Sequence, residues 1–530
     1  MDPEASPRDT ARTIARAGIV VTIAFAISRV LGYARYVVIG STLEAGRDLD
    51  AFFAAFRIPD FLFQLVAAGA LSSALIPILS GLLAHGEDAR AWRVVSSVAT
   101  LMLAILGVLS LVVFVFAPVL VPVIAPGFAG PQLATTIELT RLMLLSPIFL
   151  AAGAVVTSAL NARGRFGAAA VAPIAYNVGI IGGALVLVPL MGVHGLAVGV
   201  VLGAIAHLVV QLPALRGAGV RLRPRPGMSD PQARRALRLM VPRAIGLGGS
   251  QIVFLVVTGL ASLLPPGAIT AFTFAFAVLQ IPIGVIGVPL GVVLLPSMSR
   301  EAALGDTEAF RRLLVRGLRL IAFVMVILAA LGIVAAQDLT RLLFDYGKIG
   351  DDTIEATGVA LAVFLLGLTA HALIAVLARA FYAHQDTATP VAASLVAVVV
   401  DVALALVLVG PLGLAGLALA IAIGAWVETG ILAVLLRRAV PGLGLGEVVG
   451  VLLLTGVIGG AGAVVAFAVR QALVGAWGED PAQILVLARV VASVVVGGIV
   501  ILVASRALRI AELPTIVGVV VDLLRRRGRS

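Results

Sequence analysis

The sequence predicts an all-α polytopic membrane protein of about fourteen transmembrane helices, arranged as two six-helix lobes followed by two further helices. Hydrophobic residues make up 61% of the 530 residues and charged residues only 12%, whereas soluble domains carry roughly 25% charged residues. Long apolar runs recur along the chain, and arginines gather in every second loop between them. An internal repeat, the third observation, divides the predicted helices into the two lobes.

The net charge of +11 does not indicate a nucleic-acid-binding protein. Such a protein needs a solvated basic face beside an ordinary core, and here the charges are sparse and separate long apolar runs. The sequence has no cysteine, which excludes disulfides, thiolate metal sites and cysteine nucleophiles. It also has no HExxH, Walker A or GxSxG motif. We therefore expect neither an enzyme nor a resident cofactor or metal.

The predicted spans follow from length, because a helix needs about 20 apolar residues to cross the bilayer. Segments that meet this requirement are 14–40, 51–84, 95–125, 137–161, 168–190, 195–215, 238–264, 268–298, 314–336, 354–382, 389–409, 413–436, 448–470 and 484–506. Arginine-rich loops alternate with loops poor in basic residues, and this pattern places both termini on the cytoplasmic side. The tail 511–530 mixes apolar residues with an arginine cluster and is typical of an amphipathic segment on an anionic membrane surface.

Four pairs of similar segments lie about 220 residues apart along the chain. They pair 55–59 with 278–282, 75–80 with 294–299, 160–165 with 381–386, and 195–197 with 416–418. Two copies of one lobe that rock about a central cavity would give alternating access, so the repeat favours a transporter. The predicted domains are a first lobe (1–215), a cytoplasmic linker (216–237), a second lobe (238–436), two further helices (437–510) and the tail (511–530).

Three arginines lie where an apolar helix least tolerates them. Arg29, Arg35 and Arg57 fall within the first two predicted helices, and an arginine at the bilayer centre costs roughly 2.5–3.5 kcal/mol. The planar guanidinium binds phosphate oxygens with two donors and stays protonated, so the group predicts an anion site. An alternative is a purely structural network in which Asp60 neutralises Arg57, and Asp50, Asp48 or Glu44 pairs with Arg35. If Asp60 cancels one charge, an excess of about +2 remains, which matches a pyrophosphate.

Glycines and prolines interrupt the helices that carry these arginines and the helices that match them in the repeat. Gly32, Pro59 and Gly69 in the first lobe, with Pro282 and Gly287 in the second, are candidate bending points for gating. The alternative is that glycine and proline are simply common in membrane helices.

Two carboxylates, Asp401 and Glu428, lie within the predicted spans 389–409 and 413–436. Intramembrane carboxylates can form a cation or proton site, so we regard this pair as a candidate for the coupling ion. Each carboxyl group can instead remain protonated and inert. The sequence leaves the choice between sodium, proton and neither open.

The stretch Ser28-Arg29-Val30-Leu31-Gly32-Tyr33-Ala34-Arg35, with Asp50-Ala51-Phe52 and Ala55-Phe56-Arg57-Ile58-Pro59, resembles the MurJ (MviN) family of lipid II flippases. This family belongs to the superfamily that includes the MATE exporters. The resemblance spans essentially the whole chain in order. It implies a MATE-like fold of fourteen helices in the bacterial cytoplasmic (inner) membrane, with a cationic cavity for a lipid-linked pyrophosphate sugar.

The resemblance also implies roles for particular residues. Arg29 and Arg35 match the functional arginines of the family, Arg57 fills a basic position, and Asp50 stands at the acidic position of the outer mouth. The remaining residues expected at the substrate site are Ser28, Asp60 and Gln64. The expected partners are lipid II or a related undecaprenyl-pyrophosphate lipid and the membrane, with the membrane potential as the driving force.

Several positions depart from the family pattern. Uncharged residues stand where charged ones are typical of the family in the helices 14–40, 51–84 and 268–298, and also at the family's sodium-associated position in 238–264: Tyr36, Phe63, Gln64, Ala68, Val257, Phe276 and Ala277. The departures keep two alternatives open. One is a flippase or exporter for another lipid-linked oligosaccharide or amphiphile, and the other is a transport-inactive scaffold that recruits cell-wall synthesis or division proteins.

Overall fold

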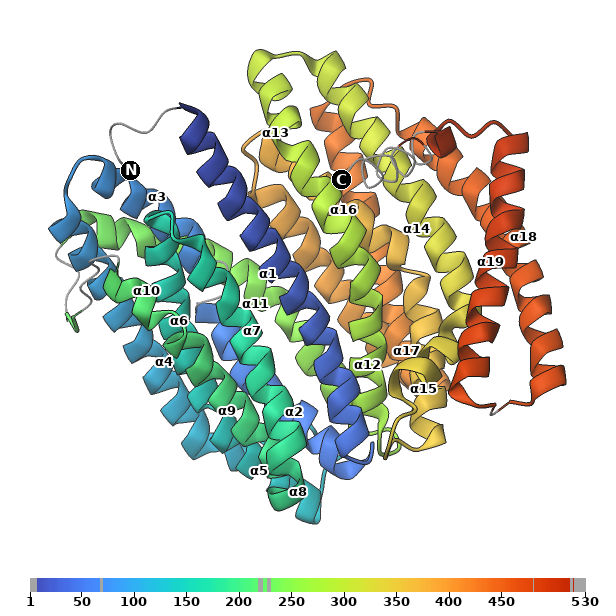
Figure 1. Ribbon diagram of the computed structural model, residues 1–530, viewed down its shortest axis with the longest axis horizontal. Coiled ribbons are helices and arrows are strands. Elements are labelled where there is room, and N and C mark those ends of the chain that lie inside the picture. Colours follow the sequence, from blue (N-terminus) through green and yellow to red (C-terminus); the bar gives the residue numbers. More distant parts are fainter. Residues whose placement is uncertain are drawn as a thin grey trace. The chain divides into compact units, whose positions relative to one another are not determined.

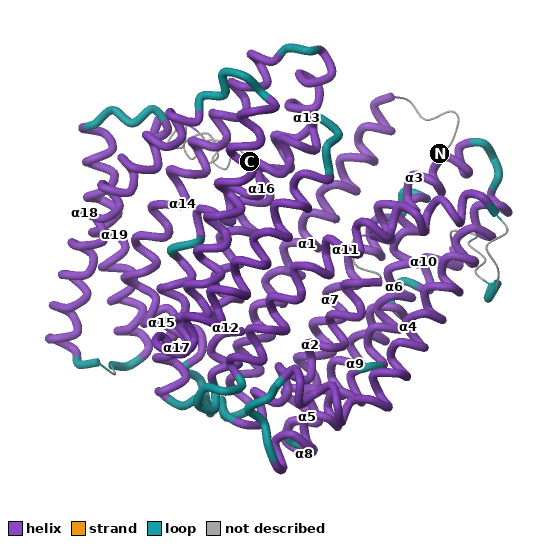
Figure 2. The backbone as a smooth tube through the Cα atoms, turned by 180° about the vertical axis from the view of Figure 1, so that it is seen from behind, coloured by secondary structure: helices purple, strands orange, loops and turns teal. Residues whose placement is uncertain are grey.

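The computed structural model describes residues 7–66, 70–217, 223–225, 230–479, 481–514 and 518. Every regular element in these residues is a helix (Figure 2), which confirms the all-α class. Within the described chain, nine helices are long and apolar enough to cross a membrane, and the bent pair α15 (Asp351–Leu365) and α16 (Leu368–Ala383) makes a tenth if counted as one span. The count of fourteen and the orientation of the termini stay predictions.

The chain divides into two compact units. The first comprises Met1–Thr270 with Tyr346–Gly350, and the second comprises Ala271–Asp345 with Asp351–Ser530. The helices of the first unit (Figure 1) are α1 (Pro7–Thr42), α2 (Arg47–Val66), α3 (Ala70–Ala84), α4 (Asp88–Ile124), α5 (Gly130–Met143), α6 (Leu145–Ala162), α7 (Phe166–Gly182), the π-helix η1 (Gly183–Leu187), α8 (Val188–Met191), α9 (Val193–Val209), α10 (Leu212–Gly217) and α11 (Pro231–Ala261).

The second unit holds the remaining helices and the two C-terminal ones. Helix α12 (Ala268–Pro282) crosses the boundary between the units, and the second unit then contains the π-helix η2 (Ile283–Gly287), α13 (Val288–Leu304), α14 (Thr307–Phe344), α15, α16, α17 (Ala388–Ala439), α18 (Leu445–Trp477) and α19 (Gln483–Ala507). Helix α17 covers two predicted spans, 389–409 and 413–436. At Gly413, φ is 54° and ψ is −131°, and this non-helical backbone divides α17 into two parts. Only glycine tolerates such a conformation without strain.

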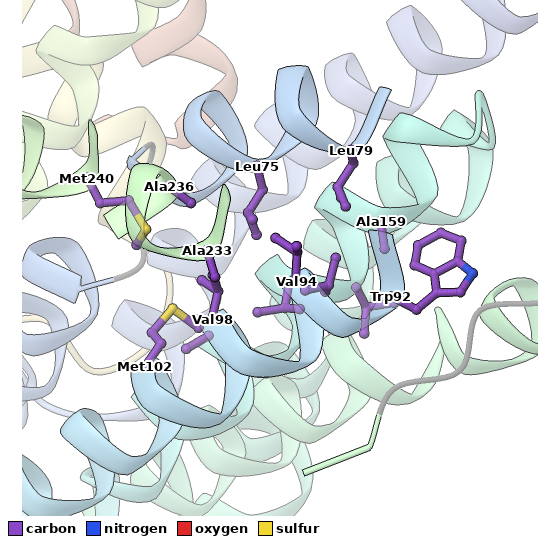
Figure 3. Close-up of a cluster of buried hydrophobic side chains, with 14 of the residues drawn as sticks. Leu75, Leu79, Trp92, Val94, Val98, Met102, Ala159, Ala233, Ala236 and Met240 are labelled. Atoms are coloured by element: carbon purple, nitrogen blue, oxygen red, sulfur yellow. The ribbon is translucent and has the colours of Figure 1, made fainter. Parts of the chain in front are cut away.

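A buried apolar cluster explains why α11 packs with the first unit. Met240 and Ala236 of α11 belong to one buried apolar cluster with Leu75 of α3, Val98 of α4 and Ala159 of α6 (Figure 3). Helix α11 contacts α2, α3 and α4, although the repeat assigns its sequence to the second lobe. The lobe boundaries drawn from the repeat stay a prediction, since packing and sequence repeat group this helix differently.

Small residues let helices of each unit approach closely, as is typical of membrane proteins. Between α7–η1 and α9, a Cβ atom at Gly183 would lie 2.5 Å from the Cα atom of Gly199, so the two backbones touch there. In the second unit, α18 and α19 form a hairpin against α14 (Figure 1). The tail predicted at 511–530 lies largely outside the described residues, but Leu513 packs against the apolar cluster of that hairpin.

Candidate functional site

The first unit brings four of the predicted substrate-binding residues together. The Nε atom of Arg57 on α2 donates to Oγ1 of Thr258 on α11 at 3.1 Å, and its guanidinium lies 5.4 Å from the ring centre of Phe254. The charge of Asp60, one turn further along α2, interacts with Arg57 and also with Arg35 of α1. The predicted anion site is thus a charged group shared by two helices, with α11 holding one of its arginines.

Arg35 and Gln64 complete this group. The guanidinium of Arg35 lies 4.8 Å from the ring centre of Tyr36, and Tyr176 of α7 lies close enough to interact electrostatically with both Arg35 and Asp60. Gln64 is within hydrogen-bonding reach of the Asp60 carboxylate. The ring of Tyr36 therefore supports the guanidinium of Arg35. No sequence pattern pointed to Tyr176, because a single tyrosine in an apolar helix is not distinctive.

Ser28 and Arg29 lie further along α1. Arg29 is partly exposed and precedes Arg35 by six residues, a rise of about 9 Å along the helix. The carbonyl oxygen of Ser28 accepts a hydrogen bond of 3.4 Å from Nδ2 of Asn177. This bond joins α1 to α7 beside Gly32, where an added Cβ would lie 3.9 Å from the same amide nitrogen. That distance is an ordinary contact, so space alone does not require glycine at position 32.

Asp50 lies away from the arginines and holds the start of α12. Its side chain is 2% exposed, and its two carboxylate oxygens accept hydrogen bonds from the backbone N–H of Gly267 at 2.7 Å and from the N–H and hydroxyl of Thr270 at 2.8 and 2.7 Å. The structural-network alternative expected a pair with Arg35, but the partners of Asp50 are Gly267 and Thr270 instead. These bonds favour a tethering role for Asp50 over direct contact with a substrate.

A pocket of about 500 Å³ opens beside Asp50. It is lined by the start of α2, the turn between α4 and α5, and the turn after α11: Arg47, Asp50, Gly127, Phe128, Ala129, Gly130, Gln132, Ser262, Leu263, Leu264 and Pro266. The two turns touch at Gly127, where a Cβ atom would lie 1.9 Å from the carbonyl oxygen of Ser262. Any larger residue at position 127 would push the turns apart.

Two of the predicted bending points, Pro282 and Gly287, border an irregular helical turn. Pro59 is buried inside α2, and Gly69 lies outside the described residues. In the second unit, η2 begins directly after Pro282 and ends at Gly287, whose added Cβ would lie 3.3 Å from Cβ of Ala372. Single-turn π-helices are frequent at functional sites and bends, so η2 supports the choice of Pro282 and Gly287 as gating candidates. Their part in gating remains a prediction.

Asp401 and Glu428 approach each other across the break in α17. The two carboxylates are close enough to repel each other when both are charged. A Cβ atom at Gly424, one turn before Glu428, would lie 1.7 Å from Oδ1 of Asp401. Oδ1 itself is buried and has no hydrogen-bond partner among the described residues. The pair is thus a preformed acidic site in the second unit, and its use by an ion stays a prediction.

One charged cluster was missed by the sequence analysis. Asp338 of α14 accepts hydrogen bonds from Nε of Arg470 on α18 at 2.7 Å and from Arg489 on α19. Arg470 is the last residue of the predicted span 448–470 and Asp338 follows the end of the predicted span 314–336, so neither charge stood out inside a membrane helix. The signal that could have found them is Arg489 itself, which lies inside the predicted span 484–506, whereas Arg506 stands at its end.

The described part of the chain contains no group of three or more histidine, aspartate or glutamate residues that could hold a metal ion. The first unit holds a cationic group with one carboxylate, and the second unit holds a separate acidic pair and a π-helix. This set of residues is suited to binding and moving a charged molecule.

Comparison with known proteins identifies the same family as the sequence resemblance. A family model described as lipid II flippase MurJ matches residues 39–508. The chain is 33% identical over 422 residues to the lipid II flippase MurJ of Burkholderia cenocepacia, a match that covers 78% of this chain and 81% of that protein. It is 31% identical over 434 residues to the probable lipid II flippase MurJ of Vibrio cholerae, covering 79% and 82%.

Solved structures show the same fold. A structure of lipid II flippase MurJ in an inward closed conformation matches with a TM-score of 0.76 at 21% identity, covering 92% of this chain and 99% of that one. An inward-facing multidrug resistance MATE family transporter of the MOP superfamily matches with a TM-score of 0.67 at 16% identity, covering 80% and 98%. These likenesses confirm the MATE-like fold that the sequence resemblance implied.

Proposed function

Because the chain belongs to the lipid II flippase MurJ family, we propose that it moves lipid II, an undecaprenyl-pyrophosphate-linked peptidoglycan precursor, from the inner to the outer leaflet by alternating access. The observation that carries this proposal is the charged group of Arg35, Arg57 and Asp60 on α1 and α2. It is a bacterial membrane protein with a transporter fold, and we propose the cytoplasmic membrane as its location and transport without catalysis as its activity.

The arginines suit a pyrophosphate for chemical reasons. Each guanidinium presents two parallel donors that match two oxygens of one phosphoryl group, and Arg35 and Arg57 face a common neighbour, Asp60. In our proposal the carboxylate of Asp60 orients the two arginines before the substrate arrives and lowers the cost of keeping them in the membrane. Arg29 receives the second phosphoryl group, and Gln64 and Ser28 offer polar atoms to the sugar.

The membrane potential can drive this export. An inside-negative potential favours outward movement of a negative head group by about 2.3 kcal/mol per charge for each 100 mV. The lipid tail stays in the bilayer, so only the head group crosses. No resident cofactor is part of this proposal.

Asp401 and Glu428 are our candidates for a coupled proton. Two carboxylates that repel each other in a buried site bind one proton in preference to none, and the buried, unpartnered Oδ1 of Asp401 is a free acceptor for it among the described residues. A sodium ion would need more oxygen ligands than this pair supplies. Proton binding when the site faces outward, and release when it faces inward, would reset the transporter.

Two other interpretations make different predictions. A flippase for another lipid-linked oligosaccharide would use the same arginines with a different sugar, whereas an exporter of cationic drugs would not need them. A scaffold that recruits cell-wall synthesis or division proteins would work without any of the three arginines. The function of such a scaffold would be to bind those proteins.

The test is a rescue of cells depleted of their own flippase, with lipid II exposed on the outer surface as the readout. We expect Arg35→Ala and Arg57→Ala to abolish rescue, and Arg35→Lys to restore only part of it, because lysine lacks the planar pair of donors. Arg437→Ala, which removes an exposed arginine at the end of α17, is the matched control. Full exposure of lipid II by the Arg35→Ala, Arg57→Ala double variant would refute the arginine site, whereas rescue of growth without exposure of lipid II would favour the scaffold.

A further inference from the structure

A pocket of about 140 Å³ lies between the start of α14 and the start of α18. It is lined by Arg311, Arg312, Val315, Arg316, Arg319, Gly444 and Glu447. Arg312, Arg316 and Arg319 follow at spacings of four and three residues, so they lie along one face of α14. The arginine pattern of the loops predicts that this end of α14 faces the cytoplasm. The pocket belongs to the second unit alone and is separate from the arginine group of α1 and α2.

Two of the four arginines are fixed in place by other groups. Arg319 donates to Glu512 at 2.6 Å and to Glu447 at 2.7 Å. Arg311 donates to the carbonyl oxygen of Gly442 at 2.7 Å and pairs with Glu308 at 2.9 Å. These two side chains form the walls of the pocket, and much of their charge is already balanced.

The other two arginines have donors to spare. Arg312 makes one exposed contact of 3.2 Å with Glu308, which Arg311 shares. Arg316 is exposed, and within the described residues it has neither a hydrogen bond nor an ion pair. Four arginines and three glutamates leave the site with a net positive charge, and the unused donors are those of Arg312 and Arg316.

We propose that this pocket binds a phosphate group, through the free donors of Arg312 and Arg316. Guanidinium groups bind phosphate oxygens in pairs. The pocket is smaller than the ~300–1,000 Å³ typical of sites for drug-sized ligands, so it suits a phosphate and not a nucleotide. Basic pockets between membrane helices on the cytoplasmic side are typical sites for anionic lipid headgroups. A soluble phosphate is the other source of the same chemistry.

The start of the C-terminal tail strengthens the case for a lipid. Glu512, 7% exposed, joins the beginning of that tail to Arg319 at the base of the pocket. The sequence that follows ends in an arginine cluster at 525–529, which by composition suits an anionic surface. The described start of the tail, at Glu512, therefore lies beside the pocket.

The experiment uses the full-length protein in phosphatidylcholine vesicles that contain a minority of phosphatidylglycerol, and native mass spectrometry counts the lipids that each protein retains. We expect wild type to retain phosphatidylglycerol in preference to phosphatidylcholine. Arg312→Gln with Arg316→Gln should weaken retention about fivefold for each arginine removed, the usual effect of one basic residue near an anionic surface. Arg234→Gln with Arg235→Gln, exposed on α11, is the control with the same charge change on the same predicted side.

The outcomes separate the two sources and can refute the site. If inorganic phosphate displaces the retained phosphatidylglycerol, the ligand is a soluble phosphate; if it does not, the ligand is a lipid headgroup. Equal loss in both double variants would show that only the general basic surface attracts the lipid, and the proposal would be wrong. The same holds if wild type shows no preference between the two lipids. Thermal unfolding of each variant checks that it is folded.

Discussion

Asp338 of α14 and Arg489 of α19 form an ion pair in which each side chain is 1% exposed. Arg470 of α18 bonds to the same carboxylate at 2.7 Å and is 18% exposed. Two positive charges thus depend on one negative charge at the point where three helices meet. Because Arg489 also donates to the carbonyl oxygen of Gly478 in the turn between α18 and α19, the pair holds that hairpin against α14.

Removing the carboxylate should destabilise the second unit strongly. We expect Asp338→Ala to lower the free energy of unfolding by about 3–5 kcal/mol, because the buried Arg489 and the half-buried Arg470 would be left without a counter-charge. Glu308→Ala, which breaks exposed pairs on the same helix, should cost less than about 1 kcal/mol. Thermal unfolding of the purified protein measures both. If Asp338→Ala unfolds at the same temperature as Glu308→Ala, the pair does not hold the hairpin.

Thr258 should matter for transport because it positions Arg57. Thr258→Val keeps the shape of the side chain but removes the acceptor of the 3.1 Å hydrogen bond from Nε of Arg57. A hydrogen bond to a charged group contributes about 1.5–3 kcal/mol, so we expect lipid II exposure to fall at least about tenfold. The control is Thr136→Val, whose hydroxyl bonds only to its own helix at the carbonyl of Gln132. Equal activity of the two variants would exclude a positioning role for Thr258.

The sequence predicted the helical class and the charged group of the first unit for a simple physical reason. A bilayer imposes length and apolar composition on every span, and a charge inside a span is costly enough to stand out. Arg35, Arg57 and Asp60 were therefore visible as residues, and helical spacing was enough to place Asp60 next to Arg57. The identity of the substrate was predicted from the resemblance to a known family.

Other features depend on contacts that no local pattern reveals. Asp50 caps the start of α12, which lies more than 200 residues away in the sequence. The sequence around a carboxylate does not indicate so distant a hydrogen-bond partner. Arg489 and Asp338 sit near helix ends, where predicted boundaries are least accurate. The π-helix after Pro282 requires a backbone shift that a proline permits but does not specify. Long-range pairing and local backbone irregularity are thus what the sequence left out.

The acidic pair in α17 predicts a difference between two neighbouring glycines. Gly424→Ala would place a Cβ atom 1.7 Å from Oδ1 of Asp401, whereas nothing lies within 4 Å of a Cβ atom at Gly430. We expect Gly424→Ala to displace Asp401 and to reduce both thermal stability and lipid II exposure, while Gly430→Ala is neutral or slightly stabilising because alanine favours helices.

A double variant identifies the cause of that loss. Asp401→Ala removes the side chain that Gly424→Ala strikes, so the two substitutions together should be at least as stable as Gly424→Ala alone. If the stability costs of the two substitutions simply add, the close contact between Gly424 and Asp401 is not the source of the defect.

The start of α17 predicts a pH dependence of stability that is independent of the transport site. Asp386, in the turn before α17, accepts hydrogen bonds from the Thr389 hydroxyl at 2.6 Å and from the backbone N–H of Thr389 and Ala388 at 3.0 Å. The bond from the Thr389 hydroxyl, with the two backbone bonds, holds the pKa of Asp386 below its usual value. Its ionised form therefore stabilises the folded protein above the pKa of the unfolded chain, about 3.9, and this contribution is lost as the pH falls through the lower folded pKa.

We expect the difference in melting temperature between wild type and Asp386→Ala to be constant from neutral pH down to about pH 5 and to shrink below about pH 4. Asp306→Ala, which removes the corresponding cap of α14, shows whether such loss is general to helix caps. A difference that is unchanged at acidic pH would mean that the carboxylate charge of Asp386 does not stabilise the start of α17.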